Sequence, residues 1–141
     1  MLAIIFIALG IKAYSYYWPK ATVQIGGQEL KVLVADNSRH LYVGWSKRKN
    51  MGKYNGMLFV FASKSQHTMV MRDMKFPLDI VWIDGKTIVD IAPNLQPDIG
   101  TTEAELIPYF ARLPSTFVLE LPAGFTAKNG VKIGDSVEIN L

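Results

Sequence analysis

The sequence contains no cysteine, and this absence removes several classes of function at once. Without a thiol the chain forms no disulfide, has no cysteine nucleophile, builds no thiolate metal site and carries no lipid-modified cysteine anchor. The redox compartment stays open, because a chain without cysteine is compatible with any of them.

Catalytic and ligand-binding motifs are also scarce. The two histidines, His40 and His67, do not stand at a metal-ligand spacing such as H-x-x-x-H, so we predict no metal site. No glycine-rich loop runs into Lys-Ser or Lys-Thr, and no G-x-S-x-G elbow is present, which argues against nucleotide enzymes and serine hydrolases. We predict no cofactor.

Charge of either sign is modest, with 15 Lys and Arg against 12 Asp and Glu and a net charge of +3. So small an imbalance does not predict nucleic-acid binding. The densest basic stretch is Lys47, Arg48 and Lys49, with Lys53 nearby. It could contact phosphate or anionic lipid, or simply be a solvated loop or helix end.

Long apolar runs are confined to the N-terminus, residues 1–19. The run after Met1 continues past Lys12 into a Tyr- and Trp-rich stretch that Pro19 ends. If Lys12 snorkels and the aromatic side chains lie at the interface, it approaches the roughly 20 residues of a membrane-spanning helix. We predict a membrane anchor here and a single domain over 20–141 on the extracytoplasmic side; a signal peptide or a segment packed on the domain are the alternatives.

Beyond Pro19, short alternating or continuous apolar segments are separated by turns. This pattern predicts a mainly β domain, a compact sandwich or barrel-like fold with one to three short helices. Gly26-Gly27 and Asp84-Gly85 predict β-hairpins. The predicted strands cover residues 21–25, 29–35, 57–61, 66–71, 79–83, 87–91, 117–121 and 136–141.

Helical and irregular segments fill the remaining lengths. We predict a short helix over 41–49 and a helical turn over 123–129 that ends at Gly130. The connection over 92–114 carries four prolines, and a capping box at Thr102 and Glu105 predicts one brief helix within it. A connection this long is often functional or mobile.

Four segments of the chain resemble an uncharacterised bacterial and archaeal family, domain of unknown function 192, over roughly residues 22–141. The segments are Gly44-Trp45-Ser46 leading to Asn55-Gly56-Met57-Leu58-Phe59-Val60-Phe61; His67 through Met71-Arg72-Asp73 to Pro77-Leu78-Asp79-Ile80; Ile83-Asp84-Gly85 with its following strand; and Val118-Leu119-Glu120-Leu121-Pro122-Ala123-Gly124-Phe125 closing with Gly130-Val131-Lys132-Ile133-Gly134-Asp135. The resemblance implies a compact mainly β fold, often secreted or membrane-tethered, with no established activity.

The chain departs from the family pattern in two places. Family members commonly read Trp-Met-Lys-Asn where this chain has 70–73, Val-Met-Arg-Asp, and Gly-Leu-Met where it has 44–46, Gly-Trp-Ser. A family pocket lined by those side chains would be altered here.

Polar residues near the ends of two predicted neighbouring strands form the first candidate binding site: His67, Arg72, Asp73 and Asp79. Arg72 could hold a carboxylate or a sugar hydroxyl, and Asp73 and Asp79 could act as acid and base. In the structural alternative, Asp79 caps backbone amides of the 75–77 turn and Arg72 pairs with Asp73 or Glu120.

Glu120 and Trp45 complete the candidate set. Glu120 interrupts an apolar strand and needs a partner if it is buried, as a member of a structural network or as a pocket carboxylate. Trp45 offers either a sugar-stacking face or a core side chain.

Function is therefore left to three expectations. The leading one is a non-enzymatic extracytoplasmic binding or accessory domain for a small polar ligand, a glycan or a partner protein of the cell envelope. The second is a cell-envelope hydrolase with paired carboxylates. The third is a structural interaction module that presents the connector over 92–114. A perturbed carboxylate in a cleft, a concave polar site or a flat apolar patch would distinguish them.

Overall fold

The structure, a computed structural model, describes residues 4–5, 7, 10, 12 and 16–141. Its elements in chain order are β1 (Lys20–Ile25), β2 (Gln28–Ala35), α2 (Ser38–Val43), β3 (Gly56–Ser65), β4 (Thr68–Met69), β5 (Leu78–Asp84), β6 (Thr87–Leu95), η1 (Glu103–Glu105), β7 (Tyr109–Phe110), β8 (Ser115–Pro122), α3 (Phe125–Lys128) and β9 (Glu138–Asn140). The expectation of a mainly β domain with a few short helices is confirmed.

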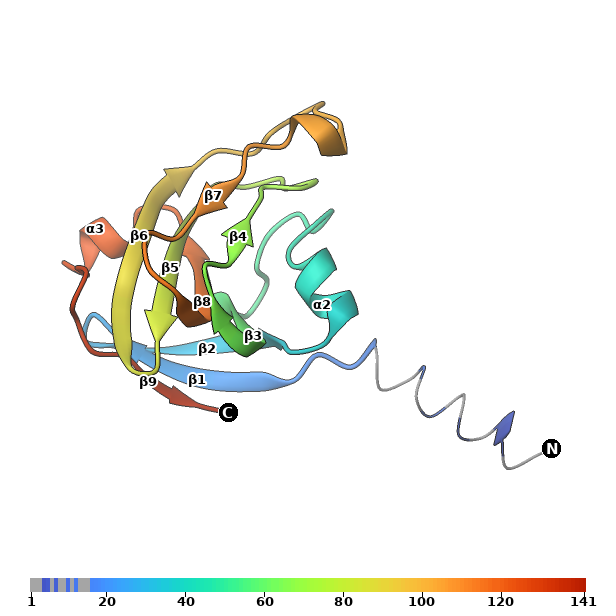
Figure 1. The fold of residues 1–141 in the computed structure, drawn as a ribbon, viewed down its shortest axis with the longest axis horizontal. Coiled ribbons are helices and arrows are strands. Elements are labelled where there is room, and N and C mark those ends of the chain that lie inside the picture. Colours follow the sequence, from blue (N-terminus) through green and yellow to red (C-terminus); the bar gives the residue numbers. More distant parts are fainter. Residues whose placement is uncertain (1–3, 6, 8–9, 11, 13–15) are drawn as a thin grey trace.

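Seven strands form one sheet in the order β6-β5-β8-β3-β2-β1-β9, and β4 pairs with β7 in a separate two-stranded sheet. The seven-stranded sheet curls into a half-barrel (Figure 1). All of its pairs are antiparallel except β2–β3, which is parallel. A parallel pair needs a crossover, and here the crossover contains α2 and the long loop after it.

Each face of the curled sheet covers its own hydrophobic cluster. Alternation along β8 shows the division, because Leu119 and Leu121 pack in one cluster while Val118 packs in the other. Strand β5, between β6 and β8, is buried along nearly its whole length, as its apolar sequence predicts. The two clusters therefore lie on opposite faces of one sheet and not between the two sheets of a sandwich.

Both predicted hairpins are present. Gly26 and Gly27 have φ angles of 56° and 73°, the left-handed conformation that glycine adopts without strain, and they join β1 to β2. Gly85, with a φ of 60°, joins β5 to β6.

Several element boundaries differ from the sequence-based expectation. The helix predicted over 41–49 is α2, which begins earlier because the Asn37 side chain accepts a hydrogen bond from the His40 amide. The strand predicted over 66–71 shrinks to the two residues of β4. Strand β6 runs on to Leu95 through Pro93, which is tolerated because β6 is an edge strand.

The N-terminal residues that are described, Ile4, Ile5, Ile7, Gly10, Lys12 and Tyr16, are helical and exposed. Within the described part of the chain, no helix is both long and apolar enough to cross a bilayer. Much of the anchor predicted over 1–19 lies outside the described residues.

Candidate functional site

A cavity of about 370 Å³ opens on the face of the sheet that carries Val118. The end of α2 and the turn after it form one wall, and β4 with the loop behind it forms another. Its apolar lining includes Leu41, Phe59, Met69 and Met74. This volume lies in the range of small-molecule sites.

The wall beside α2 depends on a close approach of backbone to ring. Helix α2 ends at Gly44, whose φ of 48° few other residues adopt. A Cβ at Gly44 would lie 3.2 Å from the Phe59 ring. Glycine therefore lets the chain turn directly over β3 and places Trp45 and Ser46 in the lining.

Glu120 is the acidic residue of this cavity. Strand β8 places it opposite Met57 of β3 and Ile80 of β5, on the same face as Val118. The side chain lines the cavity, only 4% of the residue is exposed, and Oε2 has no hydrogen-bond partner among the described residues. Burial raises the pKa of Glu120 to about 8, so the carboxyl is mostly protonated at neutral pH.

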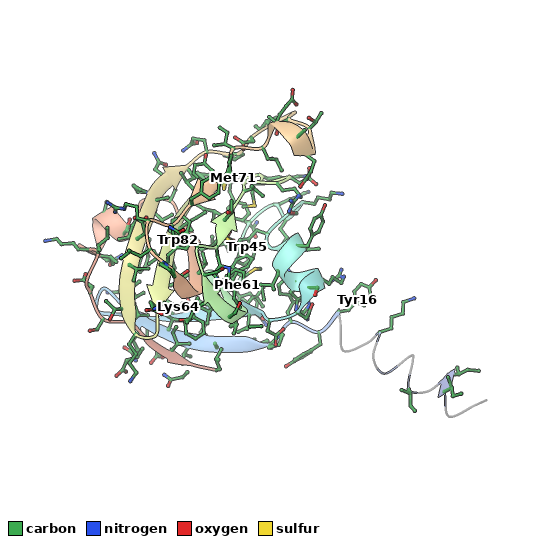
Figure 2. The ribbon with its side chains drawn as sticks, viewed as in Figure 1. Tyr16, Trp45, Phe61, Lys64, Met71 and Trp82 are labelled. Atoms are coloured by element: carbon green, nitrogen blue, oxygen red, sulfur yellow. The ribbon has the colours of Figure 1, made fainter. Side chains whose placement is uncertain are left out.

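Trp45 supplies a second unpartnered polar atom to the same lining. The residue is 1% exposed, and its Nε1–H finds no acceptor among the described residues. Its ring meets Phe76 edge-on at 6.0 Å, and the Arg48 guanidinium lies 5.3 Å from its centroid. Figure 2 shows Trp45 inside the domain, with the strands to one side of it and α2 to the other. Buried indole N–H groups usually have a hydrogen-bond partner, so this donor is an exception among the described residues.

Arg72 holds three segments together at the edge of the cavity. Its Nε donates to Glu103 Oε2 at 2.7 Å, and a second guanidinium nitrogen donates to Oε1. It also donates to the Tyr42 carbonyl at 3.1 Å and lies 4.2 Å from the centroid of the Tyr42 ring. The hydrogen bond with Glu103 raises the pKa of Arg72, and the carboxylate neutralises its charge. Arg72 pairs with neither Asp73 nor Glu120.

Asp79 lies away from the cavity, fully buried near the start of β5. Its carboxylate accepts four hydrogen bonds: from the amides of Asn94, Gly124 and Thr126 at 2.8, 2.9 and 2.8 Å, and from the Thr126 hydroxyl at 2.6 Å. Burial alone would raise the pKa of Asp79, but these hydrogen bonds outweigh it and hold the pKa below its ordinary value. Asp79 therefore links β5 to β6 and to the start of α3. The amides that it caps belong to these elements and not to the 75–77 turn.

Asp73 and His67 also lie outside the cavity lining. Asp73, with a φ of 50°, is half exposed, and its carboxylate is 3.9 Å from Lys47 Nζ. His67 stacks on Phe61 at 3.5 Å, and its Nε2 lies 3.0 Å from the Ser63 carbonyl oxygen. The structure therefore brings Glu120, Trp45 and Arg72 together and leaves Asp73, Asp79 and His67 at three other places.

Several cavity residues were not anticipated from the sequence, among them Phe59, Thr68, Met69 and Met74. Gly44 is the local sequence signal for the cavity wall formed by 41–46, because glycine commonly marks a turn with a positive φ. Nothing local indicates that Glu103, in the connector, meets Arg72. Within the described ranges, no group of three His, Asp or Glu side chains is close enough to hold a metal ion.

Comparisons with known proteins support the fold described above. Residues 21–139 match the family DUF192, described as "Uncharacterized ACR". A crystal structure of a "putative transcription regulator" from Sinorhizobium meliloti 1021 is 29% identical with a TM-score of 0.73, covering 87% of this chain and 94% of that one. A protein of unknown function from Novosphingobium aromaticivorans DSM 12444 is 28% identical with a TM-score of 0.71, covering 86% and 84%. No curated protein matches the chain. With nearly its whole length matched, the chain belongs to the DUF192 family.

Proposed function

We propose that this domain is a non-enzymatic binding domain and that a small polar ligand occupies the cavity over Glu120. The observation that carries the proposal is the buried Glu120 carboxyl with an unpartnered oxygen in a cavity of about 370 Å³. A buried polar atom without a partner costs roughly 1–3 kcal/mol, and a ligand that satisfied it would recover that cost on binding.

The available hydrogen-bond groups define the ligand chemistry. A protonated Glu120 donates one hydrogen bond, and Trp45 Nε1–H donates another. Two donors suit a ligand oxygen, such as the hydroxyl or carbonyl of a small sugar or acyl compound. The walls of Leu41, Phe59 and Met74 suit an apolar body, and methionine adapts to its shape.

A hydrolase with paired carboxylates fits the geometry less well. Such a mechanism needs two carboxyl groups facing one bond. Glu120 is the one acidic residue in the described lining of the cavity, and the carboxylate of Asp79 is occupied by four hydrogen bonds elsewhere.

Protein docking is a second candidate, and a specific observation favours it. The connector between β6 and β8 exposes large apolar side chains, namely Ile99, Ile107, Phe110 and Leu113. Scattered exposed residues are ordinary, but four on one connector are consistent with a partner surface.

We also propose that residues 1–19 hold the domain at a membrane on the extracytoplasmic side. The support is the sequence: an apolar run followed by Tyr16, Tyr17 and Trp18 at the junction with β1. Flotation of the full chain with phosphatidylcholine vesicles tests the membrane attachment, and a chain that stays at the bottom of the gradient overturns it.

The ligand proposal is tested by thermal unfolding of the full chain in detergent, with small sugars and acyl compounds added one at a time. Intrinsic tryptophan fluorescence monitors the unfolding. A ligand at about a hundredfold excess over its Kd should stabilise the protein by about 2.7 kcal/mol. Glu120→Leu should fold and lose this gain, whereas Glu138→Gln, on the exposed edge strand β9, should keep it. The proposal fails if Glu120→Leu keeps the gain of the native protein, or if no compound stabilises either protein.

A further inference from the structure

Cationic side chains gather on α2 and on the loop between α2 and β3. We call Arg39, Lys47, Arg48, Lys49 and Lys53 the basic surface. Arg39, Lys47, Lys49 and Lys53 are exposed, and Arg48 is half-buried. From Asn37 to Arg72 the sequence contains no Asp or Glu at all. Lys47 is 3.9 Å from the Asp73 carboxylate, and because both side chains are exposed this pair is weak.

Aromatic side chains join the basic surface to the N-terminal segment. Trp18 stacks on His40 of α2 at 3.9 Å, and the Arg48 guanidinium lies 5.1 Å from the Trp18 ring. The Arg39 guanidinium lies 4.1 Å from the Tyr16 ring. Figure 2 labels Tyr16 on the side of the domain where Figure 1 shows α2. Arg39 and Arg48 of the basic surface therefore lie beside the point where the chain enters the domain.

The neighbours of the basic surface indicate the kind of partner. Tyr16 and Tyr17 are more than half exposed, at 56% and 59%, and the apolar run precedes them directly in the sequence. Exposed Tyr next to an apolar run is typical of the headgroup level of a bilayer, and Lys and Arg at that level attract anionic lipids. Duplex DNA would also attract the cations, but it offers nothing to the apolar run.

We propose that the basic surface rests on anionic lipid headgroups and fixes the orientation of the domain on the bilayer. The orientation rests on the proposed membrane attachment of residues 1–19, and it adds a second, charge-dependent contact. Each Lys or Arg near an anionic surface contributes about 1 kcal/mol, which is roughly a fivefold gain in affinity.

Hydrogen exchange of the full chain reconstituted in vesicles tests the contact. One set of vesicles contains phosphatidylcholine alone and the other contains about 30% phosphatidylglycerol, each at about 50 mM and about 500 mM salt. We expect amides of 44–55 to exchange at least about threefold more slowly with phosphatidylglycerol at low salt, and the difference to vanish at high salt. Amides of 84–87 and 128–136, in turns outside the basic surface, should exchange equally in all four conditions.

Two triple variants complete the test. Lys47→Gln/Lys49→Gln/Lys53→Gln should lose the lipid dependence at 44–55, and Lys86→Gln/Lys128→Gln/Lys132→Gln, with equal charge removed from other exposed positions, should keep it. The proposal is overturned if exchange at 44–55 ignores lipid charge, if both triple variants behave alike, or if the first variant loses binding to duplex DNA and keeps its response to phosphatidylglycerol. Flotation distinguishes this proposal from the membrane attachment of residues 1–19. If the chain floats with neutral vesicles but exchange at 44–55 does not depend on lipid charge, the attachment is supported and the lipid contact of the basic surface is wrong. If the chain floats with anionic vesicles alone, the lipid contact is supported and the attachment through the apolar segment is wrong.

Discussion

The guanidinium of Arg72 and the carboxylate of Glu103 form a two-bond ion pair between residues that are 31 positions apart. The pair joins the loop after β4 to η1 in the connector, and the contacts of Arg72 with Tyr42 extend the link to α2. Bidentate pairs of this geometry fix both partners in orientation as well as in distance.

Breaking this pair should loosen the connector more than the sheet. We expect Arg72→Gln and Glu103→Gln each to increase the rate of thermolysin cleavage within 96–108 several-fold, and the double variant to add little to either. The melting temperature should change little, because Glu103 lies on the surface. Lys64→Gln, which removes an exposed pair with Asp84 outside the connector, should leave the cleavage rate unchanged. Equal effects of all three single variants would contradict the link.

Glu120 should make the stability of the protein depend on pH. Its pKa in the folded chain, about 8, lies above its ordinary value of 4.5, so the folded state holds the proton more tightly than the unfolded state. Its contribution is present in full below about pH 4.5 and is lost as the pH rises to about 8, by a few kcal/mol in total. Glu120→Gln, which mimics the neutral carboxyl, should flatten unfolding free energies measured in urea between pH 5 and pH 8. A wild-type curve that is already as flat as that of the variant would refute a raised pKa.

Asp79 should be a structural carboxylate. Asp79→Asn replaces one acceptor oxygen by an NH2 group that faces N–H and O–H donors, and we expect a loss of about 3 kcal/mol at pH 7. Asp84→Asn, at the other end of the same strand, should cost less than about 1 kcal/mol. Because the pKa of Asp79 is lowered in the folded state, the difference in unfolding free energy between the native protein and Asp79→Asn should shrink as the pH falls through that pKa. Chemical unfolding of both variants measures these free energies, and similar losses of stability in Asp79→Asn and Asp84→Asn would contradict this role.

Gly56 should tolerate no side chain. A Cβ at this position would overlap the Glu120 carbonyl oxygen of the neighbouring strand, which is backbone and cannot move away cheaply. We expect Gly56→Ala to cost about 2 kcal/mol or more in urea unfolding. Gly27→Ala has open space and should show only the strain of a positive φ, about 1 kcal/mol. If Gly56→Ala is the milder variant, the close strand contact is wrong.

The sequence predicts the local features well. The hairpins at Gly26 and Gly85 and the burial of β5 follow from turn chemistry and from apolar continuity, which are properties of a few adjacent residues. The link of Glu105 to Thr102 is also local: the Glu105 carboxylate accepts from the Thr102 amide at 2.8 Å.

The site is less predictable because its contacts are long-range. Asp73 and Asp79 are close in sequence, but the chain between them turns, so that one is half exposed and the other is enclosed by β6 and α3. The partner of Arg72 comes from the connector, where charge alone does not single out Glu103. Glu120 was recognisable from the sequence as a candidate site residue, because burying a carboxyl in an apolar strand costs free energy unless the carboxyl has a hydrogen-bond partner.

The position of β1 between β2 and β9 also has a mechanical meaning. The N-terminal segment continues directly into β1, so tension applied through it pulls along the strand and loads the six-pair ladder with β2 all at once. The C-terminus leaves from the same end, since Thr22 of β1 stands opposite Asn140 of β9. Tension between the two chain ends would instead peel β9 away one pair at a time. Force between the N-terminus and the far end of β2 would therefore load that ladder in shear, whereas force between the two chain ends would open the sheet first at β9.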